Sequence, residues 1–388
     1  MSRAALALLL FALLLGTASA FAQLEKITIP AGTPEDKALQ AISSEPDAQK
    51  KLALFEDFVH TFSSNPMAVA YGNWQIAQYY QTSGDLGKAL SYGDKALTAR
   101  PDDLDVLVAQ TNVAAQMKNS ARIVEYATRG GKAYNTALHQ PKPASVTDAE
   151  YASRLAEAKE SNKSSYEFLE TAAFNAIVDE KDAKTRMTYI ERFTPAFPGS
   201  RFDEPVSQYA LFTLGQLKDS ARLFAYGENA LAANPNSMPT LLLLANSYVD
   251  DTRPDSLAKA VTYSQKVIEL AKADAPDADK SRRLSGGVAH STLGYAYAKE
   301  DKTAAAIPEL QSAAALLKGQ DDVAYATALY RLGWAYGKIN EIADARAVLE
   351  EAVRIPGPLQ GPSQDLLNKV NAARPKKKPS SKPASEPR

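Results

Sequence analysis

Small and large apolar residues recur along the chain at intervals of three and four residues, the spacing of one helical face, and turn residues separate successive faces. Between 73 and 101 they form two successive helical faces, at Ile76, Ala77, Tyr80, Ala89, Leu90, Tyr92, Ala96 and Leu97. Gly84 separates the two faces, and Pro101 ends the second because proline cannot continue a helix. The pattern therefore predicts a helix hairpin across these residues.

The second half of this hairpin returns later in the chain. The sequence YGDKALTARP, Tyr92–Pro101, recurs as YGENALAANP, Tyr226–Pro235, with six of ten residues identical at an offset of 134. Gln40–Phe62 also aligns without a gap on Asn175–Phe197, with eight of 23 residues identical at an offset of 135. The nearly equal offsets predict that a block of about four repeat-sized units was duplicated. We interpret the recurring segment as a packing unit and not as a catalytic motif.

The positions of small residues in this pattern resemble the tetratricopeptide repeat. The clearest matches are LGYAY, Leu293–Tyr297, and LGWAY, Leu332–Tyr336. They are followed at the family's spacing by small and apolar residues, namely Ala306, Leu310 and Ala313, and Ala345, Leu349 and Ala352. Small residues let paired helices approach closely, and each pair leaves an apolar face that only the next pair can cover. The resemblance, to exported bacterial members of the family, implies an all-α fold: a right-handed solenoid of helix-turn-helix repeats.

Changes in composition divide the chain into segments. The predicted segments are a signal peptide at 1–22, an extended segment at 23–33, N-terminal repeats at 34–137, an irregular helical connection at 138–165, a second block of repeats at 166–274, C-terminal repeats at 275–357, a capping helix at 358–374 and a disordered tail at 375–388.

The N-terminus has the features of an export signal. Arg3 precedes an apolar run at 4–15, which is too short to span a bilayer, and an Ala-x-Ala pattern ends at Ala22. We expect cleavage before Gln23 and a periplasmic or secreted protein with no membrane-spanning segment in the mature chain. An uncleaved anchor is the alternative.

Charge and cysteine content exclude several classes of function. The 388 residues include 44 basic and 45 acidic side chains, a balance that argues against a protein that coats nucleic acid. The chain has no cysteine, which excludes disulfides, thiolate metal sites, a cysteine nucleophile and a lipidated N-terminal cysteine. The tail at 375–388 is rich in lysine and proline, and tails of this composition mostly solvate the chain end. The alternative is weak electrostatic contact with an anionic surface or an acidic partner.

No arrangement of side chains in the sequence indicates catalysis. His60, His139 and His290 lie in different repeat units without the spacing of metal ligands. The sequence RGGK, Arg129–Lys132, resembles a phosphate-binding loop, but Gly130 aligns with Ala96 inside a second helix. We therefore expect no enzymatic activity, no metal and no cofactor.

Aromatic and amide side chains recur on the first helices of the repeats. Resemblance to the family implies that the two tryptophans, Trp74 and Trp334, point into the concave groove of the solenoid. Residues at comparable positions are Tyr71, Gln78, Asn112, Asn246, Tyr295, Tyr330 and Arg331. Rings and amides together suit an extended peptide, because rings cover apolar side chains and amides pair with its backbone. The alternative is that the rings pack between neighbouring units.

These features predict a non-catalytic scaffold that binds a protein or an extended peptide in the bacterial cell envelope. An outer-membrane or envelope assembly factor is the alternative, because Phe55–Pro66 and Ile190–Phe202 resemble units of such proteins. An enzyme acting on cell-wall sugars is less favoured, since the chain shows no acid and base pair.

Overall fold

The computed structural model describes residues 26–372, and these residues form 17 α-helices. This confirms the predicted all-α architecture. The chain divides into two compact units, and the boundary lies between residues 209 and 210, within α10 (Asp203–Gln216). The predicted signal peptide and basic tail lie outside the described residues.

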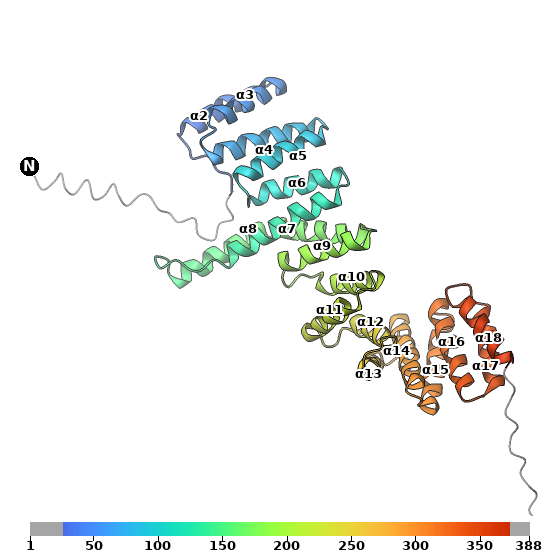
Figure 1. Ribbon diagram of the computed structural model, residues 1–388. Coiled ribbons are helices and arrows are strands. Elements are labelled where there is room, and N and C mark those ends of the chain that lie inside the picture. The colour runs from blue at the N-terminus through green and yellow to red at the C-terminus, as the bar shows by residue number, and fades with distance from the viewer. Residues whose placement is uncertain (1–25, 373–388) are drawn as a thin grey trace, which may run out of the picture. The chain divides into compact units, whose positions relative to one another are not determined.

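Unit 1, described from residue 26 to 209, is built from helices that pack against their neighbours in sequence (Figure 1). Its helices are α2 (Pro34–Ser43), α3 (Ala48–Thr61), α4 (Pro66–Thr82), α5 (Leu86–Ala99), α6 (Leu104–Gln116), α7 (Ser120–Leu138), α8 (Asp148–Asp179) and α9 (Ala183–Ala196). The hairpin expected at 73–101 is α4 and α5. Gly84 lies between them with a φ of 84°, a left-handed conformation that glycine adopts without a steric penalty.

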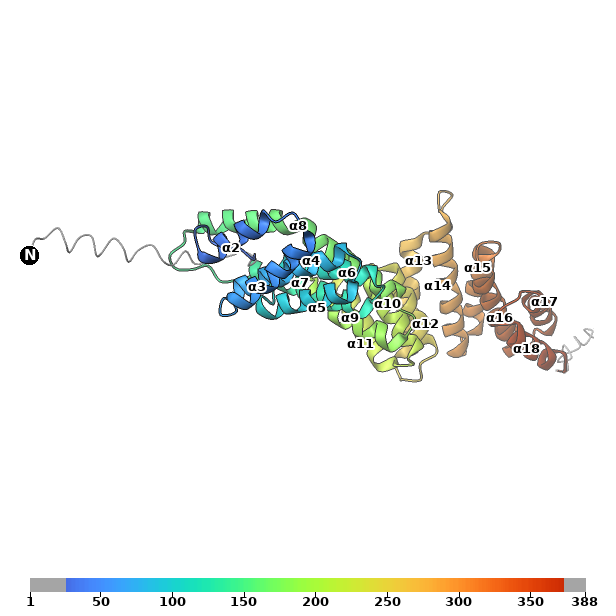
Figure 2. The ribbon, with the colours of Figure 1, turned by 90° about the horizontal axis from the view of Figure 1, so that it is seen from above.

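Unit 2, described from residue 210 to 372, continues the pairing of consecutive helices. Its helices are α11 (Ser220–Ala233), α12 (Met238–Val249), α13 (Ser256–Ala271), α14 (Lys280–Lys299), α15 (Thr303–Leu317), α16 (Asp322–Lys338), α17 (Ile342–Val353) and α18 (Gln360–Ala372). Figure 2 shows α17 and α18 beside α16. Helix α18 packs on α16 and α17, and it lies within the range expected for a capping helix, 358–374.

Aspartates begin many of the helices in both units. The Asp85 carboxylate accepts the Lys88 backbone N–H at 3.1 Å, and the Asp321 carboxylate accepts that of Ala324 at 2.8 Å. These bonds satisfy backbone donors that the first turn of a helix leaves free. The helix boundaries therefore follow from local sequence.

The small residues of the repeat pattern lie where the paired helices cross. Ala345, Leu349 and Ala352 of α17 are fully buried, and Leu349 faces Gly333 of α16. A Cβ atom at Gly333 would lie 2.5 Å from Leu349 Cγ, closer than two carbon atoms can approach. The resemblance therefore placed the crossing point of this hairpin correctly.

The segment expected to be an irregular connection, at 138–165, is more regular than its sequence suggested. Residues 139–147 form the connection, and α8 then runs for 32 residues (Figure 1, Figure 2). The Thr147 hydroxyl accepts the Glu150 N–H, and the Glu150 carboxylate accepts the Thr147 N–H. This capping box is readable as T-x-x-E in the sequence, although no repeat motif marks the helix behind it.

The extended segment before α2 lies against unit 1. Ile27 and Ile29 are half-buried and pack on the apolar core, whereas Thr28 between them is exposed. The Ile27 N–H donates to the Asp103 carboxylate at 2.9 Å, and burial raises the pKa of that carboxyl group. Among residues 26–372, no helix is both long enough and apolar enough to cross a membrane.

Candidate functional site

Three first helices of successive hairpins, α12, α14 and α16, lie side by side in unit 2. We call the surface they share the first-helix face. It is defined by six residues: Asn246, Ser291, Thr292, Tyr295, Arg331 and Trp334. Four of them, Asn246, Tyr295, Arg331 and Trp334, are residues that the sequence proposed for a groove, and the structure brings these four together.

Hydrogen bonds link the polar residues of the first-helix face across all three helices. The Thr292 hydroxyl donates to Asn246 Oδ1 at 2.7 Å, and Arg331 Nη1 donates to the hydroxyls of Ser291 and Thr292 at 3.1 and 3.4 Å. Asn246 Nδ2 in turn donates to the backbone oxygen of its own helix at Leu242. Both ends of the Asn246 amide are thus engaged within the protein, so this side chain positions Thr292 and Arg331.

One aromatic ring, that of Tyr295, contacts the guanidinium of Arg331. The guanidinium carbon lies 4.7 Å from the centre of the Tyr295 ring, and the Tyr295 and Trp334 rings meet edge to face at 5.4 Å. Tyr295 and Trp334 are half-buried, and Trp334 also packs on the core of α14 to α18. Tyr330, the fifth groove candidate in unit 2, packs partly on the same core.

Arg331 carries a positive charge that no carboxylate neutralises by direct contact. Among residues 26–372, no Asp or Glu oxygen lies within ion-pair distance of its guanidinium. Burial lowers the pKa of Arg331, although Asp250 and Tyr295 act in the opposite direction. A partly desolvated cation without a counter-charge is costly to the protein, and perturbed groups of this kind gather at functional sites.

Two lysines close the C-terminal end of the first-helix face. Lys299 Nζ donates to the Val249 backbone oxygen at 2.6 Å, and Lys338 Nζ donates to that of Ala298 at 2.6 Å. The same two ammonium groups pair with Asp250 and Asp301. Each lysine thus caps the C-terminus of the preceding first helix, where a cation is favourable. Their charges are compensated, unlike that of Arg331.

The groove candidates in unit 1 are not gathered at one place. Asn112 is exposed and lines a groove of about 560 Å³ between α6 and α8, beside Phe168 and Asn175. Gln78 lines a separate groove of about 250 Å³ between α3 and α4. Tyr71 is half-buried on α4.

Trp74 packs against the apolar core that α5, α6 and α7 form in unit 1. Its Nε1 atom is buried without a hydrogen-bond partner. Part of the Trp74 ring therefore packs on neighbouring helices.

The polar cluster that most resembles a catalytic site is a set of contacts between α11, α12 and α13. The Glu228 carboxylate accepts hydrogen bonds from Tyr248, Tyr263 and Lys259, each at 2.7 Å. Burial acts to raise the pKa of Glu228, but these three donors outweigh it and lower that pKa. A carboxylate held by three donors is stabilised as an anion, which disfavours proton transfer and suits a structural role.

The histidines are dispersed in the structure as in the sequence. His290 Nδ1 lies 2.6 Å from the Glu309 carboxylate, and His139 Nδ1 lies 2.7 Å from the Asn135 backbone oxygen. Within the described part of the chain, no group of three or more His, Cys, Asp or Glu side chains could hold a metal ion.

Comparisons with known proteins match one repeat of the chain to a family model. Residues 326–357, in the α16–α17 hairpin, match the family model of the tetratricopeptide repeat. Among solved structures, the chain is similar to the TPR domain of P58(IPK), with 12% sequence identity over 88% of this chain and 98% of the other. The TM-score of that match is 0.29, too low to support a common arrangement of the helices. No functionally curated protein matches the sequence.

Proposed function

We propose that this tetratricopeptide-repeat chain is a non-catalytic scaffold that binds an extended segment of a partner protein on the first-helix face of unit 2. The observation that carries the proposal is the guanidinium of Arg331. It is held in place by two hydroxyls and a tyrosine ring, yet it lacks a carboxylate partner. The partner segment supplies that carboxylate.

The surroundings of Arg331 define what else the segment presents. Arg331 and Lys299 lie over the Tyr295 ring, and Lys338 lies over the Trp334 ring. The parts of these half-buried rings that remain exposed suit an apolar side chain next to the acidic one. Lys299 and Lys338 are already paired, so a single carboxylate satisfies the unmet charge. The expected ligand is therefore an extended peptide with one acidic and one neighbouring apolar side chain.

Paired peptides test this assignment. Short extended peptides that differ only in Glu against Gln are titrated against the full chain, with the fluorescence of Trp334 and Trp74 as the signal. Because a charge-assisted hydrogen bond contributes about 1.5–3 kcal/mol, the wild type should prefer the Glu peptide by about ten-fold or more. Arg331→Gln should abolish that preference.

Arg354→Gln is the matched control, because Arg354 is exposed in unit 2 at the end of α17, outside the first-helix face. It should retain the preference of the wild type. Equal binding of the Glu and Gln peptides by the wild type would contradict the assignment of Arg331.

The proposed place of action is the bacterial cell envelope or its exterior. The support is the apolar run at 4–15, followed by the Ala-x-Ala pattern before Gln23. Fractionation distinguishes a periplasmic or secreted scaffold from an envelope assembly factor: recovery in the osmotic-shock fluid or the medium supports the scaffold, and retention on washed membranes supports the assembly factor.

A further inference from the structure

A pair of glycines brings the backbone of α7 against two neighbouring helices in unit 1. A Cβ atom at Gly130 would lie 2.5 Å from Leu169 Cδ1 of α8, and one at Gly131 would lie 2.7 Å from the Ala196 backbone oxygen of α9. Asn135 Nδ2 of α7 donates to the same Ala196 oxygen at 2.9 Å. The backbones of α7 and α9 are therefore in close contact, and the Asn135 amide links them.

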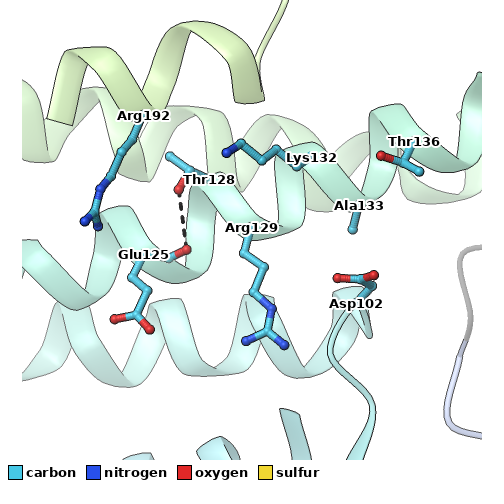
Figure 3. A pocket seen from close by; sticks show the side chains of 8 residues that line it. All are labelled: Asp102, Glu125, Thr128, Arg129, Lys132, Ala133, Thr136 and Arg192. Carbon is cyan, nitrogen blue, oxygen red and sulfur yellow. Dashed lines mark hydrogen bonds between the residues drawn. The ribbon is translucent and has the colours of Figure 1, made fainter. Parts of the chain in front are cut away.

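This close approach brings Arg192 of α9 to the same pocket as Arg129 and Lys132 of α7, the two residues that flank the glycines. Figure 3 shows the three side chains around this pocket, with their charged groups pointing in different directions. The three cations line a pocket of about 400 Å³. The other residues that line it are Asp102, Glu125, Thr128, Ala133 and Thr136. The sequence RGGK thus has inward-facing glycines that serve packing and outward-facing cations that share one pocket.

The positive charge of this pocket exceeds the negative charge available inside it. Arg122, outside the pocket, binds the Glu125 carboxylate at 3.0 Å. Arg129 Nη2 donates to the Leu97 backbone oxygen at 3.1 Å, a neutral acceptor that fixes the guanidinium without cancelling its charge. Within residues 26–372, neither Lys132 nor Arg192 forms an ion pair. Three cations are thus set against two carboxylates, those of Asp102 and Glu125, and Glu125 shares Arg122 with Asp94.

We infer that this pocket binds the phosphoryl group of a small molecule. Arginine and lysine donors are well suited to phosphate oxygens, and one tetrahedral phosphoryl group offers acceptors in several directions at once. A single carboxylate offers two oxygens in one plane, which suits three separated cations less well. The volume falls within the range of small-molecule sites and leaves room for the group that carries the phosphate. This site lies in unit 1 and is independent of the first-helix face.

The probe for the test is inorganic phosphate, titrated into the full chain at constant ionic strength and followed by the broadening of its ³¹P resonance. Lys132→Ala and Arg192→Ala should each weaken binding by about three-fold, and the double variant by about ten-fold, as expected for partly exposed ion pairs. Melting temperatures without phosphate should be unchanged, because both side chains are exposed.

Lys184→Ala is the control, because it removes an exposed cation from α9 outside the pocket. It should bind phosphate as the wild type does. Equal weakening in Lys184→Ala, or no phosphate binding by the wild type, would overturn the inference.

Vesicles that contain phosphatidylglycerol separate a free phosphate compound from a lipid headgroup. The inference expects no vesicle binding that depends on Lys132 and Arg192. If the wild type binds the vesicles but not free phosphate, and if Lys132→Ala and Arg192→Ala each abolish vesicle binding, the pocket is assigned to a membrane surface. That result would overturn the small-molecule assignment.

Discussion

The Tyr126 hydroxyl of α7 donates a 2.6 Å hydrogen bond to the Asp94 carboxylate of α5. Arg122, one turn before Tyr126, pairs with the same carboxylate at 3.0 Å. The segment Tyr92–Pro101, which contains Asp94, recurs at Tyr226–Pro235, and the contact recurs with it: Tyr263 and Lys259 of α13 both bind Glu228 of α11. Glu228 stands 134 residues after Asp94, the offset of the duplicated sequence. The duplicated block therefore preserves an interhelical contact as well as a sequence pattern.

Removing the buried hydroxyl of Tyr126 should destabilise unit 1. We expect Tyr126→Phe to lower the free energy of unfolding by about 1–2 kcal/mol, because the hydroxyl donates to a charged acceptor. Chemical denaturation measures the change. Tyr79→Phe is the control, since the Tyr79 hydroxyl makes no hydrogen bond among the described residues. An equal effect of both substitutions would mean that the Asp94 contact contributes nothing specific.

The corresponding Glu228 cluster should make unit 2 sensitive to acid. Hydrogen bonds lower the pKa of Glu228 below its ordinary value of 4.5, so its contribution to stability is present above that value. It is lost as the pH falls through the lowered pKa of the folded protein, because the carboxylate must then be protonated. Stability measured by denaturation between pH 6 and about pH 3 should therefore fall less in Glu228→Gln than in the wild type. Glu269→Gln, which changes an exposed carboxylate on α13, should follow the wild type.

Two glycines of α16 should respond in opposite directions to the same substitution. Gly333→Ala places a methyl group against Leu349 and should destabilise the protein by about 1–3 kcal/mol. Gly337→Ala meets no atom within 4 Å and should stabilise α16 by up to about 1 kcal/mol, the difference in helix propensity. Melting curves of the two variants test the crossing geometry. A stable Gly333→Ala protein would show that α16 and α17 do not approach as closely as described.

The unpaired charge of Arg331 should cost stability in the absence of a partner. We expect Arg331→Met to leave the free energy of unfolding unchanged or to raise it by about 1 kcal/mol, because a desolvated cation is replaced by an apolar chain of similar length. The matched comparison is Arg282→Met in the same unit, since Arg282 donates to the Ala271 backbone oxygen at 2.7 Å. That variant should lose about 1 kcal/mol. A clear loss in Arg331→Met would instead assign Arg331 to structure.

Export should remove the first 22 residues. We expect the protein recovered from the periplasm or the medium to begin at Gln23, as shown by intact mass and N-terminal sequencing. Exported protein that retains Met1 would contradict both the cleavage site and the proposed leader.

The sequence by itself determined the helices and the way they pair. Capping residues such as Asp85 act on backbone groups three residues away, and the crossing residues Gly333 and Leu349 lie within one hairpin. Information of this kind is local, and a repeat array is stabilised mainly by contacts within a repeat and with the next one. Periodicity and residue size were therefore sufficient to predict the all-α repeat architecture.

The tertiary structure alone decided which polar side chains meet and which of them remain without a partner. Asn246, Thr292 and Arg331 come from three helices, and only their packing shows that both ends of the Asn246 amide form hydrogen bonds whereas Arg331 lacks a carboxylate partner. Likewise, RGGK gives no sign that α9 adds Arg192 to its two cations. A repeat pattern specifies the size of a side chain at each position, because packing depends on size. The pairing of charges depends on which side chains neighbouring helices bring within about 4 Å, and that distance exists only in the folded protein.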